Sequence, residues 1–144
     1  MGLDDPAKKM SKSAPHEENY IALLDSPEEV AKKIQHAVTD SEKEVRFDQG
    51  NKPAISNLLT IFSLFTDTPV LKLEKQFAGK GYGDFKKELT EVISAGLEPI
   101  QTKYRELEKN QKDVMSVLEA GLKEAQEIST KTLKDVKDKI GLIS

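Results

Sequence analysis

The chain has 144 residues, enough for one domain of ordinary size, with 37% hydrophobic residues, 33% charged residues and a net charge of −3. It contains no cysteine, which excludes disulfides, thiolate metal sites and cysteine nucleophiles. The slightly acidic balance argues against a protein that binds nucleic acid through its overall charge, so any contact with RNA would need a local basic patch.

The first eighteen residues contain two prolines and little apolar material, which predicts a loop. Within this loop lies the run Lys9-Met10-Ser11-Lys12-Ser13. Lysine ammonium groups on mobile stems and serine hydroxyls are suitable donors to phosphate oxygens, so the run predicts a loop that closes over a polyphosphate. The alternative is a solvated, disordered tail, which is common for lysine- and serine-rich segments near an N-terminus.

Three helices are predicted over the middle of the chain. The first begins at Ser26-Pro27, with Glu29 at the capping-box position, and ends near residues 39–41. The second begins at Pro53 and is apolar nearly all round, so we expect it to be the central, buried helix. The third is short, begins at Thr68-Pro69 and stops at Gly79.

Two long helices complete the chain. One runs from about Tyr82 to about Glu108, and the other follows Asn110 and stops at Gly141. Because the link between them is short, we expect them to be antiparallel neighbours. The sequence therefore predicts an all-α fold, a helical bundle of about five helices with an N-terminal loop extension.

Few other residues suggest chemistry. His16 and His36 have no partners at metal-ligand spacing, so we assign no metal site. The glycine-punctuated run 79–83 is best interpreted as a tight turn with Tyr82 packed inward. Its functional alternative is that nearby lysines contact an RNA backbone at a helix N-terminus. Residues 1–20 lack a signal-peptide core, and no apolar run is long enough to span a bilayer, so we expect a cytoplasmic protein without a membrane partner.

Several segments resemble one family in their order and spacing. The Lys9–Ser13 run matches the second signature of the class I aminoacyl-tRNA synthetases letter for letter. The later segments resemble the C-terminal portion of the bacterial tryptophanyl-tRNA synthetases, and the resemblance covers essentially the whole chain. These segments are Ser26–Ile34, Ala37–Ser41, Pro53–Leu59, Gly79–Lys86, Leu97–Gln101 and Tyr104.

The resemblance implies two segments with different functions. Residues 1–18 would be the signature (KMSKS) loop and the edge of a catalytic domain, and residues 19–144 a helical domain that recognises the tRNA anticodon. The other class signature, a His-x-Gly-His-like motif, and the strand–helix alternation of a Rossmann-type domain are absent from the 144 residues. We therefore expect a C-terminal fragment of a tryptophan–tRNA ligase that is inactive alone, from a parent that is a homodimer.

The resemblance also implies roles for the loop residues. Lys9 and Lys12 would be catalytic, stabilising charge on the pyrophosphate that leaves ATP, and Lys9, Met10, Ser11, Lys12 and Ser13 would bind ATP. Magnesium is expected with ATP in the parent, and no cofactor is expected to bind this fragment tightly. One departure is that Ala14-Pro15 follows the motif, where the family often has an acidic residue.

The implied partners are the tRNA for tryptophan and the missing catalytic domain, with no role for DNA. Candidate tRNA contacts are given by basic residues near the predicted long helix: Lys80, Lys86, Lys87, Lys103 and Arg105. The competing hypothesis is a helical protein-interaction module in which the pentapeptide is coincidental.

Overall fold

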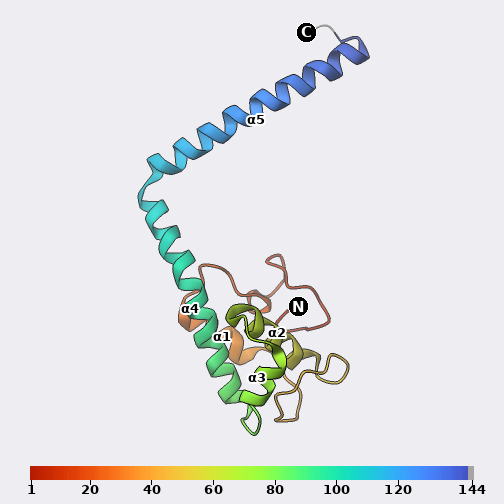
Figure 1. The fold of residues 1–144 in the computed structure, drawn as a ribbon, viewed down its shortest axis with the longest axis vertical. Coiled ribbons are helices and arrows are strands. Elements are labelled where there is room, and N and C mark those ends of the chain that lie inside the picture. The colour runs from red at the N-terminus through yellow and green to blue at the C-terminus, as the bar shows by residue number, and fades with distance from the viewer. Residues whose placement is uncertain (143–144) are drawn as a thin grey trace. The chain divides into compact units, whose positions relative to one another are not determined.

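The computed structural model describes residues 1–142 as helices joined by loops and turns, with no strand in that range (Figure 1). The elements are a short 3-10 helix η1 (Glu17–Asn19) and five α-helices: α1 (Pro27–His36), α2 (Pro53–Thr66), α3 (Val70–Gln76), α4 (Tyr82–Lys109) and α5 (Gln111–Ile140). The all-α prediction is confirmed. The chain divides into two compact units, Met1–Gln101 and Thr102–Ser144, which are described separately below.

Helix α1 begins as its sequence predicts. The Ser26 hydroxyl accepts from the Glu29 N–H at 3.3 Å, and the Glu29 carboxylate accepts from the Ser26 N–H at 2.7 Å, which completes a capping box. The helix ends at His36, a few residues before the predicted stop. The backbone leaves the helical region at Ala37, at φ −50° and ψ 135°, and the Val38 N–H donates to the Leu3 carbonyl at 2.9 Å, a partner outside the helix.

Helix α2 is the central helix that its composition predicts. Ile55, Leu58, Leu59 and Phe62 are all buried, and Pro53 occupies the first turn. Helix α3 follows after Asp67, which has left-handed backbone at φ 50°. Among residues 1–142 no single helix is long and apolar enough to cross a membrane, although α2 and α3 pass that test together across a 106° bend.

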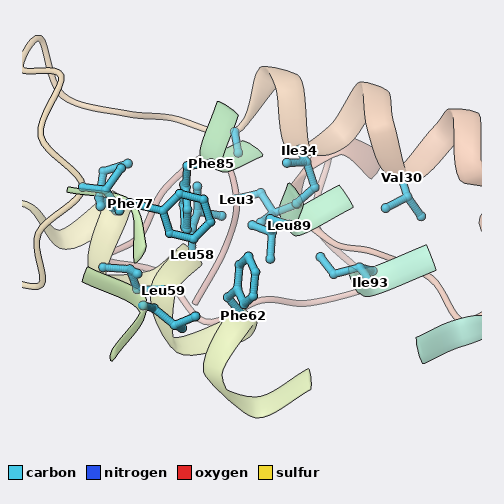
Figure 2. Packing of buried hydrophobic residues seen from close by; sticks show 14 of the residues in the cluster. Leu3, Val30, Ile34, Leu58, Leu59, Phe62, Phe77, Phe85, Leu89 and Ile93 are labelled. Carbon is cyan, nitrogen blue, oxygen red and sulfur yellow. The ribbon is translucent and has the colours of Figure 1, made fainter. Parts of the chain in front are cut away.

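Three phenylalanine rings form the centre of the first unit (Figure 2). Phe62 of α2 lies edge-on to Phe77 at 5.7 Å between ring centroids and stacks on Phe85 of α4 at 6.0 Å. Phe77 and Phe85 meet edge to face at 5.0 Å. Leu3, from the N-terminal segment, belongs to the same buried cluster, so the core includes the stem of the predicted loop.

The apolar stripe of α4 is buried only in the part of the helix that belongs to the first unit. Phe85, Leu89, Ile93 and Leu97 are buried. Every described residue after Gln101 is exposed except Lys137, which is half-buried, and α5 buries none of its residues. The antiparallel packing predicted for the two long helices is therefore not confirmed, since it would bury the apolar stripe of α5. Helix α5 does stop at Gly141, at φ 75°, as predicted.

One prediction concerns the aromatic centre. Phe77→Ala should lower the free energy of unfolding by about 3–5 kcal/mol, because it removes a ring that contacts two others and leaves a cavity. Leu71→Ala, on the exposed side of α3, should change it by less than about 0.5 kcal/mol. Urea denaturation of the chain followed by circular dichroism measures both, and equal losses would contradict this account of the core.

Candidate functional site

The loop that contains the lysine–serine run is closed at its base by backbone hydrogen bonds. The Gly2 N–H donates to the Lys8 carbonyl at 2.8 Å, and the Lys8 N–H donates to the Asp5 carbonyl at 3.1 Å. The Lys8 ammonium pairs with the Asp5 carboxylate at 3.0 Å, and this hydrogen bond, with one from the Ala7 N–H, lowers the pKa of Asp5. Lys8 therefore has an ion-pair partner within the stem.

The two lysines of the predicted site, unlike Lys8, have no ion-pair partner among the described residues. Lys9 and Lys12 are exposed, and neither forms an ion pair within residues 1–142. Between them, Met10 is half-buried against the hydrophobic core. The methionine thus attaches the loop to the folded unit while its charged neighbours remain in solvent.

The serines of the run shape the loop locally. The Ser11 carbonyl accepts from the Ala14 N–H at 3.1 Å, and the Ser11 hydroxyl accepts from the Ser13 N–H at 3.2 Å. Both bonds stabilise a turn over residues 11–14. A hydroxyl that accepts one bond still has its own proton to donate, so Ser11 can also bind an anion oxygen.

A surface hollow lies beside the loop. It is lined by Asp4, Lys8, Lys9, Ser11, Ser13, Ala14, Pro15, His16 and Asn19. The hollow combines ammonium, hydroxyl and backbone donors, which are the groups that bind phosphate oxygens. The structure thus brings Lys9, Ser11 and Ser13 together at one surface feature.

Two of the residues predicted to contact tRNA, Lys80 and Lys87, do not form a basic patch. Lys80 pairs with Glu88 at 3.0 Å and lies over the Phe77 ring. Lys87 lines the same surface hollow as Lys80, but Asp84, Glu88 and Glu91 line it too. Three carboxylates beside two ammonium groups give this hollow no positive excess, so it is a poor site for an RNA backbone.

Lys86 is the clearest departure from these predicted contacts. Its side chain is buried, and its ammonium donates to the Gln35 carbonyl at 2.8 Å and the Ala37 carbonyl at 2.7 Å, at the end of α1. Burial lowers the pKa of Lys86. A cation at a helix C-terminus is favourable, and here it satisfies carbonyls that the helix leaves without partners. Lys86 is therefore unavailable to a phosphate in this structure, so its prediction as an RNA contact is not supported.

The two remaining candidates lie in the second unit. Lys103 is exposed and pairs with Glu106 at 3.1 Å, and the Arg105 guanidinium donates to the Thr102 hydroxyl at 3.3 Å. An exposed ion pair within one helix contributes little to stability and breaks readily, and the exposed hydrogen bond of Arg105 leaves its charge without a counterion among the described residues. Both side chains can thus exchange these partners for an anion.

The glycine-rich run 79–83 forms the turn into α4, with Tyr82 packed inward, as the sequence predicts. Tyr82 packs against the core, and its hydroxyl donates to the Asp40 carboxylate at 2.6 Å. Lys52 is 2% exposed and contacts Glu42 at 2.6 Å, Asp40 at 3.3 Å and the Tyr82 hydroxyl at 3.0 Å. Burial opposes the charge of Lys52, but hydrogen bonds to Glu42, Tyr82 and Asp40 outweigh it and raise the pKa of the lysine.

The sequence did not predict the cluster of Lys52, Asp40, Glu42 and Tyr82. It also did not predict the burial of Asn19, whose side chain accepts from the Ser11 N–H at 3.3 Å. The cluster combines residues from three separate segments, and no periodic pattern connects them. Asn19 begins a short apolar run, residues 19–24, and this run is the one sequence signal that could have indicated an anchor for the loop.

The chain is similar to known proteins along nearly its whole length. Residues 1–98 match the family described as tRNA synthetases class I (W and Y). The chain is 47% identical over 142 residues to the tryptophan–tRNA ligase of Bacillus subtilis and 48% identical over 143 residues to that of Caldanaerobacter subterraneus. In each case the match covers 99% of this chain and 43% of the relative.

Solved structures give the same result. The tryptophanyl-tRNA synthetase of Mycoplasma pneumoniae matches the whole chain with a TM-score of 0.81 and 38% identity, and the match covers 45% of that chain. The enzyme of Campylobacter jejuni matches 98% of the chain with a TM-score of 0.72 and 32% identity, over 43% of its own length. The chain therefore belongs to the class I tRNA synthetase family (W and Y), and it spans less than half the length of these relatives.

The assignment of Lys86 leads to a prediction. Lys86→Met keeps most of the buried stem but removes the ammonium from two carbonyls, so it should lower the free energy of unfolding by about 1–3 kcal/mol. Lys87→Met removes the same charge from an exposed neighbouring position and should have little effect. Thermal or urea unfolding of the two variants compares them directly. A Lys86 variant as stable as the Lys87 variant would contradict the proposed cap.

Proposed function

We propose that the chain is the C-terminal part of a tryptophan–tRNA ligase. In this proposal the Lys9–Ser13 loop binds the phosphates of ATP and the helical remainder binds the tRNA for tryptophan. The observation that carries the proposal is the loop itself, which presents Lys9 and Lys12 without ion-pair partners in the described chain. Similarity to tryptophan–tRNA ligases along 99% of the chain supports the same function and disfavours a coincidental pentapeptide.

The reaction assigned to the whole enzyme has two steps. A carboxylate oxygen of tryptophan attacks the α-phosphorus of ATP, the bond to the β-phosphate oxygen breaks, and pyrophosphate leaves. The activated tryptophan is then transferred to its tRNA. The role of Lys9 and Lys12 is to stabilise the negative charge that develops on the leaving pyrophosphate, which is a contribution made mainly in the transition state.

The serines support this role. Ser11 and Ser13 line the hollow beside Lys9 and supply hydroxyl donors to the same phosphates. Within residues 1–142 no group of three carboxylate, imidazole or thiol side chains is arranged to hold a metal ion. No residue is therefore assigned as a ligand of the magnesium that accompanies ATP.

In this proposal residues 1–18 form the ATP-binding loop and residues 19–144 bind the tRNA anticodon. The boundary after residue 18 differs from the boundary of the compact units, because the buried Leu3 makes the stem of the loop part of the first unit. Lys103 and Arg105 are the strongest of the candidate backbone contacts, since their present partners are exposed and weakly held. A cytoplasmic location and a homodimeric parent belong to the same proposal.

The loop assignment predicts a measurable affinity. Lys9→Ala combined with Lys12→Ala should weaken binding of tripolyphosphate to the chain at least about tenfold, because two charge-assisted contacts are lost. Titration followed by nuclear magnetic resonance of the loop amides measures it. The double variant Lys43→Ala with Lys72→Ala is the control, since it removes two exposed positive charges outside the loop and should leave the affinity nearly unchanged. Equal weakening by all the lysine substitutions would mean that only net charge matters.

The tRNA assignment predicts selective binding. In a gel-shift titration, tRNA with the tryptophan anticodon should bind the chain more tightly than the same tRNA with another anticodon. Both affinities should fall as salt rises, because phosphate contacts release counterions. Lys103→Ala with Arg105→Ala should weaken both complexes together, since backbone contacts carry no base information. Identical affinity for the two anticodons would argue against an anticodon-binding role.

A further inference from the structure

Asn19 is the buried polar residue that connects the signature loop to the folded unit. It is 4% exposed, and its side-chain oxygen accepts from the Ser11 N–H at 3.3 Å. We propose that Asn19 is a positioning residue, which holds the Lys9–Ser13 loop in the arrangement that binds phosphate. This inference rests on the proposed function of the loop and adds a residue that lies outside the motif.

The orientation of the Asn19 amide is fixed by its second partner. The Asn19 Nδ2 donates to the Asp4 carboxylate, which as an ionised group can only accept hydrogen bonds. With the nitrogen turned to Asp4, the amide oxygen is the atom left to receive the Ser11 N–H. The pair of contacts thus defines which way the amide points and which atom the loop binds.

The backbone of Asn19 is held as firmly as its side chain. Its carbonyl accepts from the Leu3 N–H at 2.9 Å, and Leu3 itself is buried in the core. A Cβ atom at residue 2 would collide with the Asn19 Nδ2, so glycine at this position allows the close approach of the amide. Asn19 is therefore a rigid point against which a loop residue can be placed.

The hydrogen bond to Ser11 acts at the middle of the signature run. On one side of it, Met10 packs against the core. On the other side, the hydrogen bonds that close the turn over residues 11–14 in the described part of the chain run from Ser13 and Ala14 back to Ser11. Without the Asn19 contact this turn would be attached to the unit only through the flanking chain. The Asn19 side chain thus supplies a hydrogen bond that ties the turn carrying Lys12 to the rest of the first unit.

Asparagine suits this role better than its close analogues. Aspartate has the acceptor for Ser11, but it would place a second carboxylate against Asp4, and like charges at this distance repel. Alanine would remove both bonds. In contrast, Asp4→Asn keeps an oxygen that can accept from the Asn19 Nδ2, so it is a matched control that preserves the orientation of Asn19.

The first test is amide hydrogen exchange in the chain, measured by nuclear magnetic resonance. Asn19→Ala and Asn19→Asp should each speed exchange of the Ser11 N–H at least about tenfold, while the Leu59 N–H in the centre of α2 keeps its rate. Asp4→Asn should leave the Ser11 rate close to that of the unchanged chain. Unaltered exchange at Ser11 would overturn the proposal. Equal acceleration at Ser11 and Leu59 would also overturn it, because Asn19 would then support the whole unit rather than the loop.

The second test is the affinity for tripolyphosphate. Asn19→Ala leaves the net charge unchanged, so the expected loss of about three- to tenfold would come from the cost of ordering the loop on binding. If the unchanged chain binds through Lys9 and Lys12 but Asn19→Ala binds as tightly or more tightly, the positioning role alone is overturned. If the unchanged chain shows no binding that depends on these lysines, the proposed function of the loop fails, and the positioning role fails with it.

Discussion

Contact among Phe62, Phe77 and Phe85 is the interaction on which the first unit depends. The three rings come from α2, the end of α3 and the start of α4, and each contacts the other two at 5.0–6.0 Å between centroids. Offset and edge-to-face contacts add to the hydrophobic stabilisation of the buried rings. Leu3 belongs to the same cluster, so the segment that leads into the signature loop folds together with the helices. The position of a solvent-exposed loop is thus determined by an apolar core.

The sequence predicted well those features that local chemistry specifies. The capping box at Ser26, the proline start of α2 and the glycine stop of α5 each depend on neighbouring residues, and each is found in the structure. The loop was predicted from residue type alone, and the structure leaves Lys9 and Lys12 exposed without ion-pair partners in the described chain. Boundaries were less accurate where the end of a helix depends on a distant partner.

Contacts between distant segments explain most of what the sequence did not predict. Lys86 and Lys87 are adjacent lysines that the sequence does not distinguish, yet Lys86 is buried at the end of α1 and Lys87 is exposed. The difference comes from tertiary packing, because residues 49 and 51 positions away in the chain supply the carbonyls. In the same way, the apolar stripe of α5 has a helical period that predicts a buried face, but periodicity does not specify a partner.

The cap that Lys86 provides also bears on how freely the sequence can vary. Its ammonium binds the main-chain carbonyls of residues 35 and 37, and every amino acid has such a carbonyl. Exchanging the side chain at position 35, which is exposed, leaves the acceptor in place, whereas losing the lysine removes the donor. The attachment of α4 to α1 therefore tolerates a change of side chain at position 35, whereas at position 86 it requires a lysine.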